Sequence, residues 1–409
     1  METACSPAGA LSGILLSVAL IVILLRFRFD LGLSLFAGAA LIGLCSGLGF
    51  ERALVTLALS CIKASTLRLL AVIVLIMFLA EVASHHGYLE TFTRALQRLI
   101  SDRRLNMCLI PAFGGLLPMP GGAMWSAPLV RSVGDAPDIT PEHLTFVNYW
   151  FRHVWEYVLP IYPGLVLASA ILSIPIESIV ITQAPLCGAA IASGAVVVFM
   201  RISRGDGEPA KARSVLREIL GLLSGIWPFA FVILFVLVFK VDLLAVIVAT
   251  IIIIALLERT GLRRLGGLAR KSFSLSTISL VLGVMAFKEI MEVGGVITVF
   301  PGLLGVLRVP DAAVLFLVPM LVGLLTGITQ AFVGVAFPVV LPFALASVSP
   351  VSAVAIAYAG GFLGVLLSPV HLCLILTHHY FGARLGGIYR LMVFPTVIVA
   401  LVAFAIGLR

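Results

Sequence analysis

Two stretches of this sequence repeat one another and decide its fold. Residues 105–130 read "LNMCLIPAFGGLLPMPGGAMWSAPLV", and residues 314–340 read "VLFLVPMLVGLLTGITQAFVGVAFPVV". Gly115 aligns with Gly323, each is followed by a Leu-Leu pair, and a later shared proline follows a two-residue insertion in the second copy. Each copy is an apolar segment interrupted near its middle, so the pair predicts two structural repeats.

Composition sets the class of protein. Of 409 residues, 61% are hydrophobic and 11% are charged, whereas soluble domains carry about 25% charged residues. Apolar runs recur along the whole length, and each suits a bilayer core, which needs roughly 20 helical residues. The alternation typical of a transmembrane β-barrel does not occur in the sequence. The sequence therefore predicts an all-α polytopic membrane protein.

A second pair of stretches extends the repeat. Residues 149–169 align with residues 358–378 at an offset of 209, so that Tyr149 matches Tyr358. The first repeat is then residues 1–203 and the second is residues 218–409, joined by a polar cytoplasmic linker, 204–217. Each repeat is expected to have five spans, one of them broken, plus one re-entrant hairpin. An odd number of crossings inverts the second repeat, and inverted repeats with interrupted segments are typical of secondary transporters.

The expected elements follow from the apolar runs. The ten spans are placed at 9–25, 31–49, 65–85, 141–173 (broken), 177–200, 218–239, 241–258, 273–292, 350–380 (broken) and 387–408. Residues 88–101 form an amphipathic segment with Arg94 and Arg98 on one side, which indicates an interfacial helix.

The distribution of Lys and Arg predicts orientation. With the N-terminus outside, 19 of the 27 bases lie on the inner side of the membrane and six lie outside, as the positive-inside rule requires. Both termini are then extracytoplasmic, in a multi-pass inner (plasma) membrane protein. The net charge of +8 is explained by these loops, so no nucleic-acid partner is expected. The six cysteines are dispersed and indicate packing residues rather than disulfides.

The interrupted stretches are too short to cross the bilayer. Residues 105–117 span roughly 20 Å as a helix, and "PMPGG", 118–122, cannot continue it because proline lacks an N–H group and glycine bends cheaply. The second copy breaks at "TGITQ", 326–330. Broken backbone at membrane depth lies within protein or lines a watery cavity. We expect re-entrant hairpins at about 104–134 and 311–345; the alternative for the first is an ordinary proline-kinked span.

Charges inside the first broken helix point to a site. In "NYWFRHVWEYVLPIYPG", 148–164, Arg152 and Glu156 are spaced as neighbours on one helical face, with Asn148 toward the same face. Intramembrane charges are costly and are read as functional. Arg152 could bind a carboxylate or another oxyanion, and Glu156 could be the proton or cation site. The alternative is a structural pair that only neutralises itself.

Two further polar groups are weaker candidates. Lys288 and Glu289 are either charges near a gate or structural charges. His371, His378 and His379 suggest a metal, but no acidic or cysteine partner with ligand spacing is assigned to them, so no metal site is predicted and His378 and His379 are interpreted as interfacial.

The run "GGLLPMPGGAMWSAPLV" followed by "NYWFRHVWEYVLPIYPG" resembles a membrane-protein family of unknown function within the ion transporter superfamily of citrate, dicarboxylate, gluconate, lactate and arsenite carriers. The resemblance covers essentially the whole chain. It implies a homodimer with a scaffold domain and a moving transport domain, which works by elevator-type alternating access. It also implies that the hairpin tips and helix breaks form the site, namely Pro118, Pro120, Gly121, Gly122, Ser126, Thr326, Thr329, Gln330, Pro160, Ser368 and Pro369.

The chain departs from this superfamily at the hairpin tips. Sodium-coupled dicarboxylate members carry Ser-Asn-Thr there, and this chain has "PMPGG" and "TGITQ", so their sodium ligands cannot be transferred. The expected function is secondary active transport of a small organic anion, a carboxylate by resemblance, coupled to protons at Glu156 or to Na⁺, with Thr326, Pro160 and Pro369 as further coupling positions. No cofactor is expected beyond Na⁺ as a coupling ion. The alternatives are an anion channel of the same architecture and an intramembrane enzyme, the latter disfavoured because no HExxH or GxSxG motif occurs.

Overall fold

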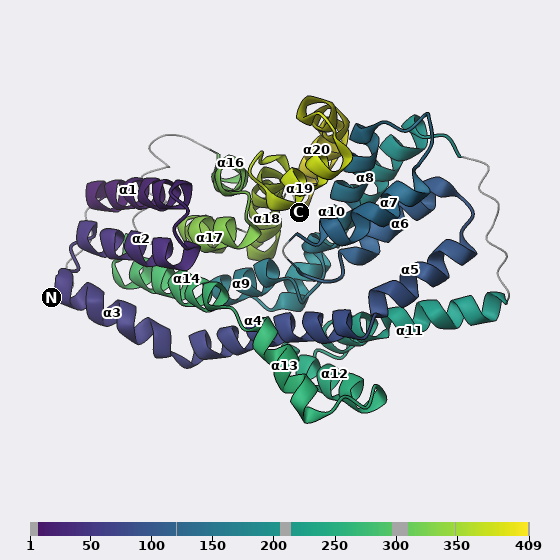
Figure 1. Cartoon of the computed structure of the whole chain (residues 1–409). Helices are drawn as coiled ribbons and strands as arrows, with labels where there is room; N and C mark the ends of the chain where they lie inside the picture. The colour runs from purple at the N-terminus through teal and green to yellow at the C-terminus, as the bar shows by residue number, and fades with distance from the viewer. Residues whose placement is uncertain (1–6, 120, 205–213, 297–309, 348, 408–409) are drawn as a thin grey trace.

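The structure is a computed structural model that describes residues 7–119, 121–204, 214–296, 310–347 and 349–407 (Figure 1). Within these ranges every regular element is helical, which confirms the all-α class and agrees with a polytopic membrane protein. Some sequence-based expectations lie outside the described residues: Pro120, linker residues 205–213, Arg308 and Arg409.

The helices divide at the linker. Residues before it form α1 (Pro7–Arg26), α2 (Leu31–Cys45), α3 (Phe50–Ile62), α4 (Ala64–His85), α5 (Tyr88–Leu99), α6 (Arg103–Gly114), α7 (Ala123–Val133), α8 (Pro141–Arg152), the 3₁₀ turn η1 (Val154–Tyr157), α9 (Pro163–Leu172) and α10 (Ile176–Arg201). Residues after it form α11 (Val215–Ile233), the π turn η2 (Leu234–Val238), α12 (Leu243–Leu257), α13 (Leu262–Ser272), α14 (Leu275–Val293), α16 (Asp311–Thr326), α17 (Thr329–Ala346), α18 (Pro350–Leu367), α19 (Leu372–Phe381) and α20 (Leu385–Gly407).

Six described helices are long and apolar enough to cross a membrane: α1, α4, α10, α11 with η2, α18 with α19, and α20. The pair α13–α14, bent by 57°, is a seventh candidate. Helices α2 and α12 have 15 residues each, about 22 Å, which is less than the roughly 30 Å core. The expectation of five spans in each repeat therefore stays a prediction.

Two amphipathic helices were not expected from the sequence. The predicted span 31–49 ends at Cys45 because Gly47 and Gly49 adopt positive φ angles of 85° and 76°, which glycine tolerates. Helix α3 follows, with Phe50 exposed. The basic segment that was expected to be a loop, 259–271, contains α13 instead.

Both interrupted stretches fold as helix pairs that break where the sequence indicated. Helices α6 and α7 flank 115–122, and α16 and α17 flank Gly327, which has a φ of 65°. The second broken helix also breaks as expected, between Leu367 and Leu372.

The first broken helix ends before Glu156, which the sequence placed on one helical face with Arg152. Helix α8 stops at Arg152, because the Nδ1–H of His153 donates to the Tyr149 carbonyl at 2.6 Å. The backbone N–H of His153 bonds to Trp150 instead, at 3.1 Å, and a 3₁₀ turn follows. Arg152 and Glu156 are therefore not α-helical i,i+4 neighbours.

Glycines bring the hairpins against the broken helices. A Cβ on Gly360 or Gly364 of α18 would lie 2.2 or 2.1 Å from the Phe316 or Met320 carbonyl oxygen of α16, so these helices touch backbone to backbone, as small-xxx-small packing in membranes allows. The hairpin copies make matching contacts: a Cβ on Gly115 would lie 2.1 Å from the carbonyl oxygen of Arg152, and one on Gly323 would lie 2.2 Å from that of Gly361.

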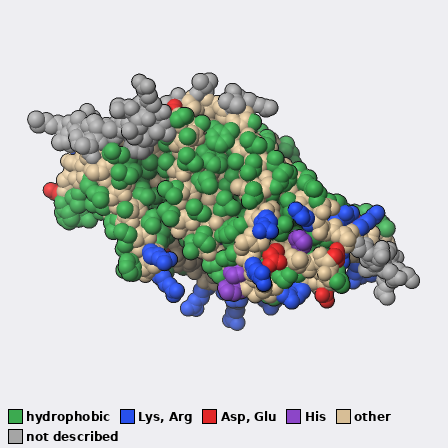
Figure 2. Space-filling view, turned by 90° about the horizontal axis from the view of Figure 1, so that it is seen from above, with side chains coloured by type: hydrophobic (Ala, Val, Ile, Leu, Met, Phe, Trp, Pro, Cys, Tyr) green, Lys and Arg blue, Asp and Glu red, His purple; other side chains and the backbone are tan. Residues whose placement is uncertain are grey.

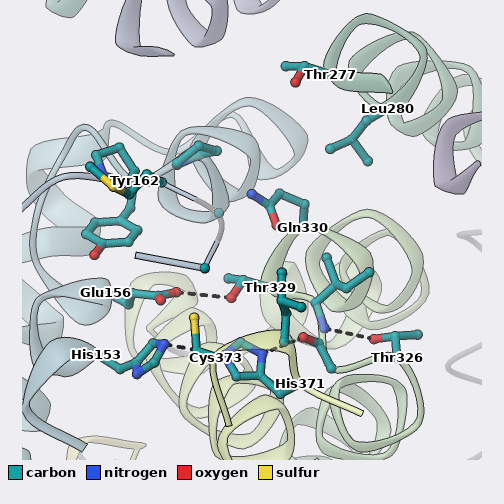
Figure 3. A pocket seen from close by; sticks show the side chains of 18 of the residues that line it. His153, Glu156, Tyr162, Thr277, Leu280, Thr326, Thr329, Gln330, His371 and Cys373 are labelled. Carbon is teal, nitrogen blue, oxygen red and sulfur yellow. Dashed lines mark hydrogen bonds between the residues drawn. The ribbon is translucent and has the colours of Figure 1, made fainter. Parts of the chain in front are cut away.

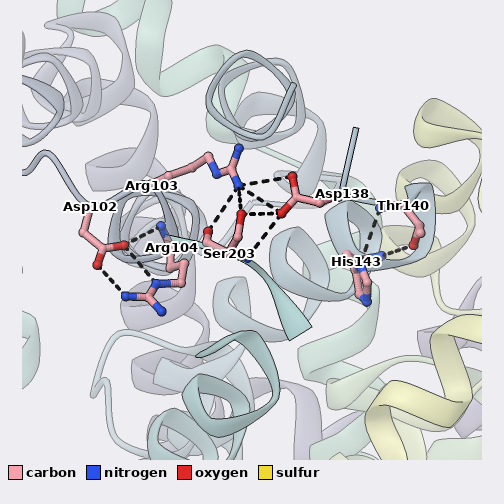
Figure 4. A network of polar contacts seen from close by, with 7 residues as sticks. All are labelled: Asp102, Arg103, Arg104, Asp138, Thr140, His143 and Ser203. Atoms are coloured by element: carbon pink, nitrogen blue, oxygen red, sulfur yellow. Dashed lines mark hydrogen bonds and ion pairs between the residues drawn. The ribbon is translucent and has the colours of Figure 1, made fainter. Parts of the chain in front are cut away.

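A polar network ties the ends of α6 and α10 to the loop before α8 (Figure 4). Arg103 donates to Asp138 at 3.2 Å and to the Ser203 hydroxyl at 2.8 Å. The hydrogen bond from the Ser203 hydroxyl, with help from Arg103, holds the pKa of Asp138 below its usual value. Close by, Thr140 caps α8 in a reciprocal bond with His143, which fixes where the helix that carries Arg152 begins.

The outer surface agrees with a bilayer environment. Figure 2 shows hydrophobic side chains over most of one face, with Lys and Arg side chains gathered along one side of it. Large apolar side chains are exposed on several spans, including Leu15, Leu223 and Leu401. Such surface is costly in water and is ordinary against lipid.

Candidate functional site

A cavity of about 430 Å³ lies where the hairpins and the two helix breaks meet (Figure 3). Its lining comes from the first hairpin (Pro118, Gly121), the second hairpin tip (326–330), the first break (Arg152, Tyr162) and the second break (370–373). Helices α4 and α14 contribute further residues, and in Figure 3 Thr277 and Leu280 of α14 stand across from the polar groups. Four interrupted elements thus bring polar groups to one buried place.

Arg152 holds the first hairpin. Its guanidinium donates to the carbonyl oxygens of Gly114 at 2.5 Å, Leu117 at 3.3 Å and Met119 at 3.2 Å. The side chain is buried and lines the cavity. Each of these carbonyls also accepts a backbone N–H in the turns after α6, so the guanidinium adds a second hydrogen bond to each. The guanidinium therefore fixes the broken segment and leaves a positive charge at the cavity.

Glu156 has a different partner from the one the sequence suggested. Its carboxylate accepts a hydrogen bond from the Thr329 hydroxyl at 3.0 Å, as Figure 3 shows. Among the described residues no ion pair within 4 Å includes Glu156 or Arg152, so the self-neutralising pair considered above does not form. Glu156 is 92% buried beside the cavity, and a buried carboxylate without a cation is costly.

Two tyrosines near this carboxylate have buried hydroxyl groups without a described hydrogen-bond partner. They are Tyr157, which follows Glu156, and Tyr358 of α18. A Cβ on Gly164 would lie 2.6 Å from Thr329 and 2.9 Å from the Tyr358 hydroxyl. Buried polar groups normally have partners, so this corner is suited to water, a cation or substrate.

His153, His371 and Cys373 form a cluster on the same cavity. One ligand atom from each lies within 4.8 Å of the others, and the Nε2 atoms of the two histidines are 3.3 Å apart. Each ring is fixed by a backbone carbonyl, Tyr149 for His153 and Gly327 for His371, both at 2.6 Å. The sequence assigned His371 no ligand partner, and the fold brings His153 and Cys373 beside it.

A second cavity, about 910 Å³, has eight charged residues in its lining, and six of them pair with one another. Lys63 binds Glu289 at 2.5 Å, Lys288 lies 3.7 Å from Glu292, and Arg68 contacts Asp242. Lys288 and Glu289, which the sequence left between two interpretations, are thus both ion-paired. We place the candidate site in the first cavity, where the charges are not paired.

A family model described as a protein of unknown function (DUF401) matches residues 10–408. The chain belongs to this family. No protein of curated function matches its sequence.

Two solved structures share the DUF401 fold. MtrF of Neisseria gonorrhoeae, described as illuminating a class of antimetabolite efflux pumps, has a TM-score of 0.62 at 14% identity, covering 88% of this chain and 84% of that chain. The YdaH transporter of Alcanivorax borkumensis, described as having an unusual topology, has a TM-score of 0.61 at 13% identity, covering 88% and 89%. These neighbours show a shared fold, and they do not support the superfamily of citrate, dicarboxylate and related carriers that the motifs resemble.

The predicted site residues of this DUF401 chain divide by position. On the cavity lie Pro118, Gly121, Arg152, Glu156, Thr326, Thr329 and Gln330. Away from its lining lie Gly122, Ser126, Asn148, Pro160, Ser368 and Pro369. Asn148 and Ser126 bond to each other at 2.6 Å and join α7 to α8, and Ser368 donates to Leu324 at 2.7 Å. The roles of the residues on the cavity stay predictions.

Sequence reasoning missed several lining residues. Tyr162 donates its hydroxyl to the Gly115 carbonyl, much as His371 bonds the second hairpin at Gly327. The two positions are 209 residues apart, which is the repeat offset, so the alignment held a signal for them. The α14 residues Thr277 and Leu280 carry no local signal, because only the packing of α14 against the hairpins brings them to the cavity.

Proposed function

We propose that this DUF401 chain is a secondary active transporter of a small organic anion, and that the first cavity is its substrate site. One observation carries the proposal: four interrupted elements meet at a buried cavity that holds an arginine and a glutamate not paired with each other. Intramembrane charges of this kind mark substrate and ion pathways, and interrupted helices at a repeat interface are where transporters bind. The transporter fold of MtrF and YdaH supports the same class.

The two charges take separate roles in this proposal. Arg152 supplies positive potential at the first hairpin, and the Thr329 and Gln330 side chains offer hydrogen bonds to a carboxylate. Glu156 is the coupling group, binding a proton or Na⁺, with Arg152, His371 and Tyr162 facing the same cavity. Since a carboxylate that binds a cation loses its negative charge, loading Glu156 would favour the entry of an anion.

The proposal also includes the arrangement of the two repeats. Residues 1–203 and 218–409 are inverted repeats, and one domain moves past a dimeric scaffold in elevator fashion. The matching contacts of Gly115 and Gly323 support the repeat. Polar contacts also join segments that the charge distribution assigns to one side: Asp30 with Ser276 inside, and Lys63 with Glu289 outside. Both termini would then face outward from the plasma membrane.

The test is a thermal-shift screen of the purified protein against organic anions, with and without sodium and across pH, followed by counterflow of each hit in liposomes. We expect saturable counterflow, which a channel does not give. Because MtrF is described with antimetabolite efflux pumps, antimetabolites belong in the screen. Thr329→Val and Gln330→Ala should each weaken binding several-fold.

Thr250→Val is the matched control, because the Thr250 hydroxyl is buried in α12 and bonds its own helix at Val246. Unchanged affinity of every hit in Thr329→Val and Gln330→Ala would remove the first cavity as the substrate site.

A further inference from the structure

The histidine–cysteine cluster has a tautomeric arrangement that its hydrogen bonds determine. A carbonyl oxygen only accepts hydrogen bonds, so the Nδ1 atom that faces it must carry the hydrogen in both His153 and His371. The neutral rings therefore present lone pairs at both Nε2 atoms, and these two atoms face each other at 3.3 Å. Two buried acceptors directed at each other need a proton donor or a cation between or beside them.

We propose that His153, His371 and Cys373 bind a thiolate-preferring transition-metal ion, Zn²⁺ or one of similar preference, at the cavity. Tetrahedral zinc with bonds of 2.0–2.1 Å to nitrogen separates two histidine ligand atoms by about 3.3 Å, which is the separation in the structure. The Sγ of Cys373 lies within 4.8 Å of both rings, so a rotation of this side chain completes a set of two nitrogens and one sulfur. Imidazole and thiolate together select zinc over magnesium or calcium.

The surroundings of the three ligands resemble those of built metal sites. Metal-binding histidines usually donate their second ring N–H to a backbone carbonyl or a carboxylate, which fixes the ring orientation. Both histidines do so here, and the carbonyls belong to α8 and to the second hairpin tip. His153 lies between α8 and η1, whereas His371 and Cys373 lie at the start of α19. The two histidines are 218 residues apart in the sequence. An ion would therefore join the two helix breaks.

A shared proton between the rings is the competing occupant. It needs only the two nitrogens, whereas an ion also uses the Cys373 sulfur that lies beside them. The 3.3 Å between the two nitrogens is long for a hydrogen bond and equals the separation that tetrahedral zinc imposes on two histidine ligands. The geometry favours the metal ion.

Three protein ligands leave one position open, as in zinc sites that bind water or substrate. All three residues line the first cavity, so the open position faces it. A divalent ion with one thiolate and two neutral rings has a net charge of +1, which favours an anion as the fourth ligand. This last step rests on the proposed transport function, whereas the metal site does not.

The experiment uses the full chain, purified in detergent, reduced and stripped of metal, and titrated with Co²⁺ and then Zn²⁺ without any organic anion. We expect one Co²⁺ per chain, with a thiolate-to-cobalt charge-transfer band and the strong visible bands of a four-coordinate ion, both removed by Zn²⁺. Failure of the transport proposal would leave this result unchanged.

Variants locate the ion. Cys373→Ser should abolish the charge-transfer band. His371→Gln should weaken metal binding more than the loss of an outer-shell partner does, which costs about 10–100-fold. Cys187→Ser, at a buried cysteine of α10, and His378→Gln, in the helix α19 that His371 precedes, are controls that should bind as the unaltered chain does. If a ligand variant does not fold, the spectrum of the unaltered chain with Co²⁺ still shows whether a thiolate-bound metal ion is present.

Two results would overturn the proposal. One is that the unaltered chain binds no Co²⁺ or Zn²⁺ at micromolar concentration, or binds them without a thiolate band. The other is that folded Cys373→Ser and His371→Gln bind with the affinity and spectrum of the controls, which would assign the ion to other residues.

Discussion

Replacing Gly364 by alanine tests the backbone contact between α16 and α18, on which the position of the second hairpin depends. The new Cβ would lie 2.1 Å from the carbonyl oxygen of Met320 and 3.0 Å from the backbone nitrogen of Leu324. Ordinary contacts of this kind are at least 3.4 Å, and both neighbours are backbone atoms that cannot rotate away. The helices must therefore separate by more than 1 Å.

The expected cost follows from packing. Overpacking a well-packed interior costs about 1–3 kcal/mol, and alanine regains up to about 1 kcal/mol of helix propensity over glycine. We expect a net loss of about 1–2 kcal/mol, and more if the hairpin detaches.

The assay is thermal unfolding of the detergent-purified chain, read by static light scattering and by thiol accessibility. Gly188→Ala in α10 is the control, because a Cβ there meets nothing within 4 Å; it should be neutral or slightly stabilising. The reasoning is refuted if Gly364→Ala unfolds at the same temperature as Gly188→Ala.

Two further predictions concern polar contacts. Arg152→Lys keeps the charge but cannot reach three carbonyls at once. Each carbonyl keeps a backbone N–H partner, so we expect a loss of about 0.5–1.5 kcal/mol for each hydrogen bond removed, less where cavity water replaces the guanidinium. Protease nicking at the first hairpin measures this loss, and unchanged protection would contradict the clamp. Asp138→Asn should lower the unfolding temperature, and the size of this decrease should be the same at every pH between 5 and 8. The pKa of Asp138 is depressed in the fold, so its contribution is present above the ordinary value near 4 and is lost as the pH falls through the folded value. The difference between Asp138→Asn and the unaltered chain should therefore shrink below about pH 4, and a difference that changes between pH 6 and 8 instead would exclude this origin.

The breaks in the fold could be predicted from the sequence because their causes are local. Pro118, which lacks an N–H group, lies in the first break, and Gly327, with a φ of 65°, lies in the second. The aligned copy supported each assignment. Charges at Arg152 and Glu156 were conspicuous for the same reason, since few residues in an apolar segment are ionisable.

Contacts between distant segments could not be predicted in this way. The partner of Glu156 is Thr329, 173 residues away, and the partners of Arg152 are carbonyl groups that any residue carries. The end of α8 depends on whether the His153 ring or its backbone N–H bonds to Tyr149, which periodicity does not reveal. Helix α3 was missed because a 13-residue amphipathic segment has no long apolar run.

Gradient-driven uptake by Glu156→Gln in liposomes tests the central claim most directly. Glutamine keeps the shape and the hydrogen bond with Thr329 but cannot bind a proton or Na⁺ as a carboxylate does. Glu218→Gln is the matched control, since Glu218 is also buried but pairs with Arg98 outside the cavity. The account predicts that Glu156→Gln exchanges substrate across the membrane but no longer accumulates it against a proton or sodium gradient, while Glu218→Gln accumulates it normally. Accumulation by Glu156→Gln at the rate of the control would contradict the account.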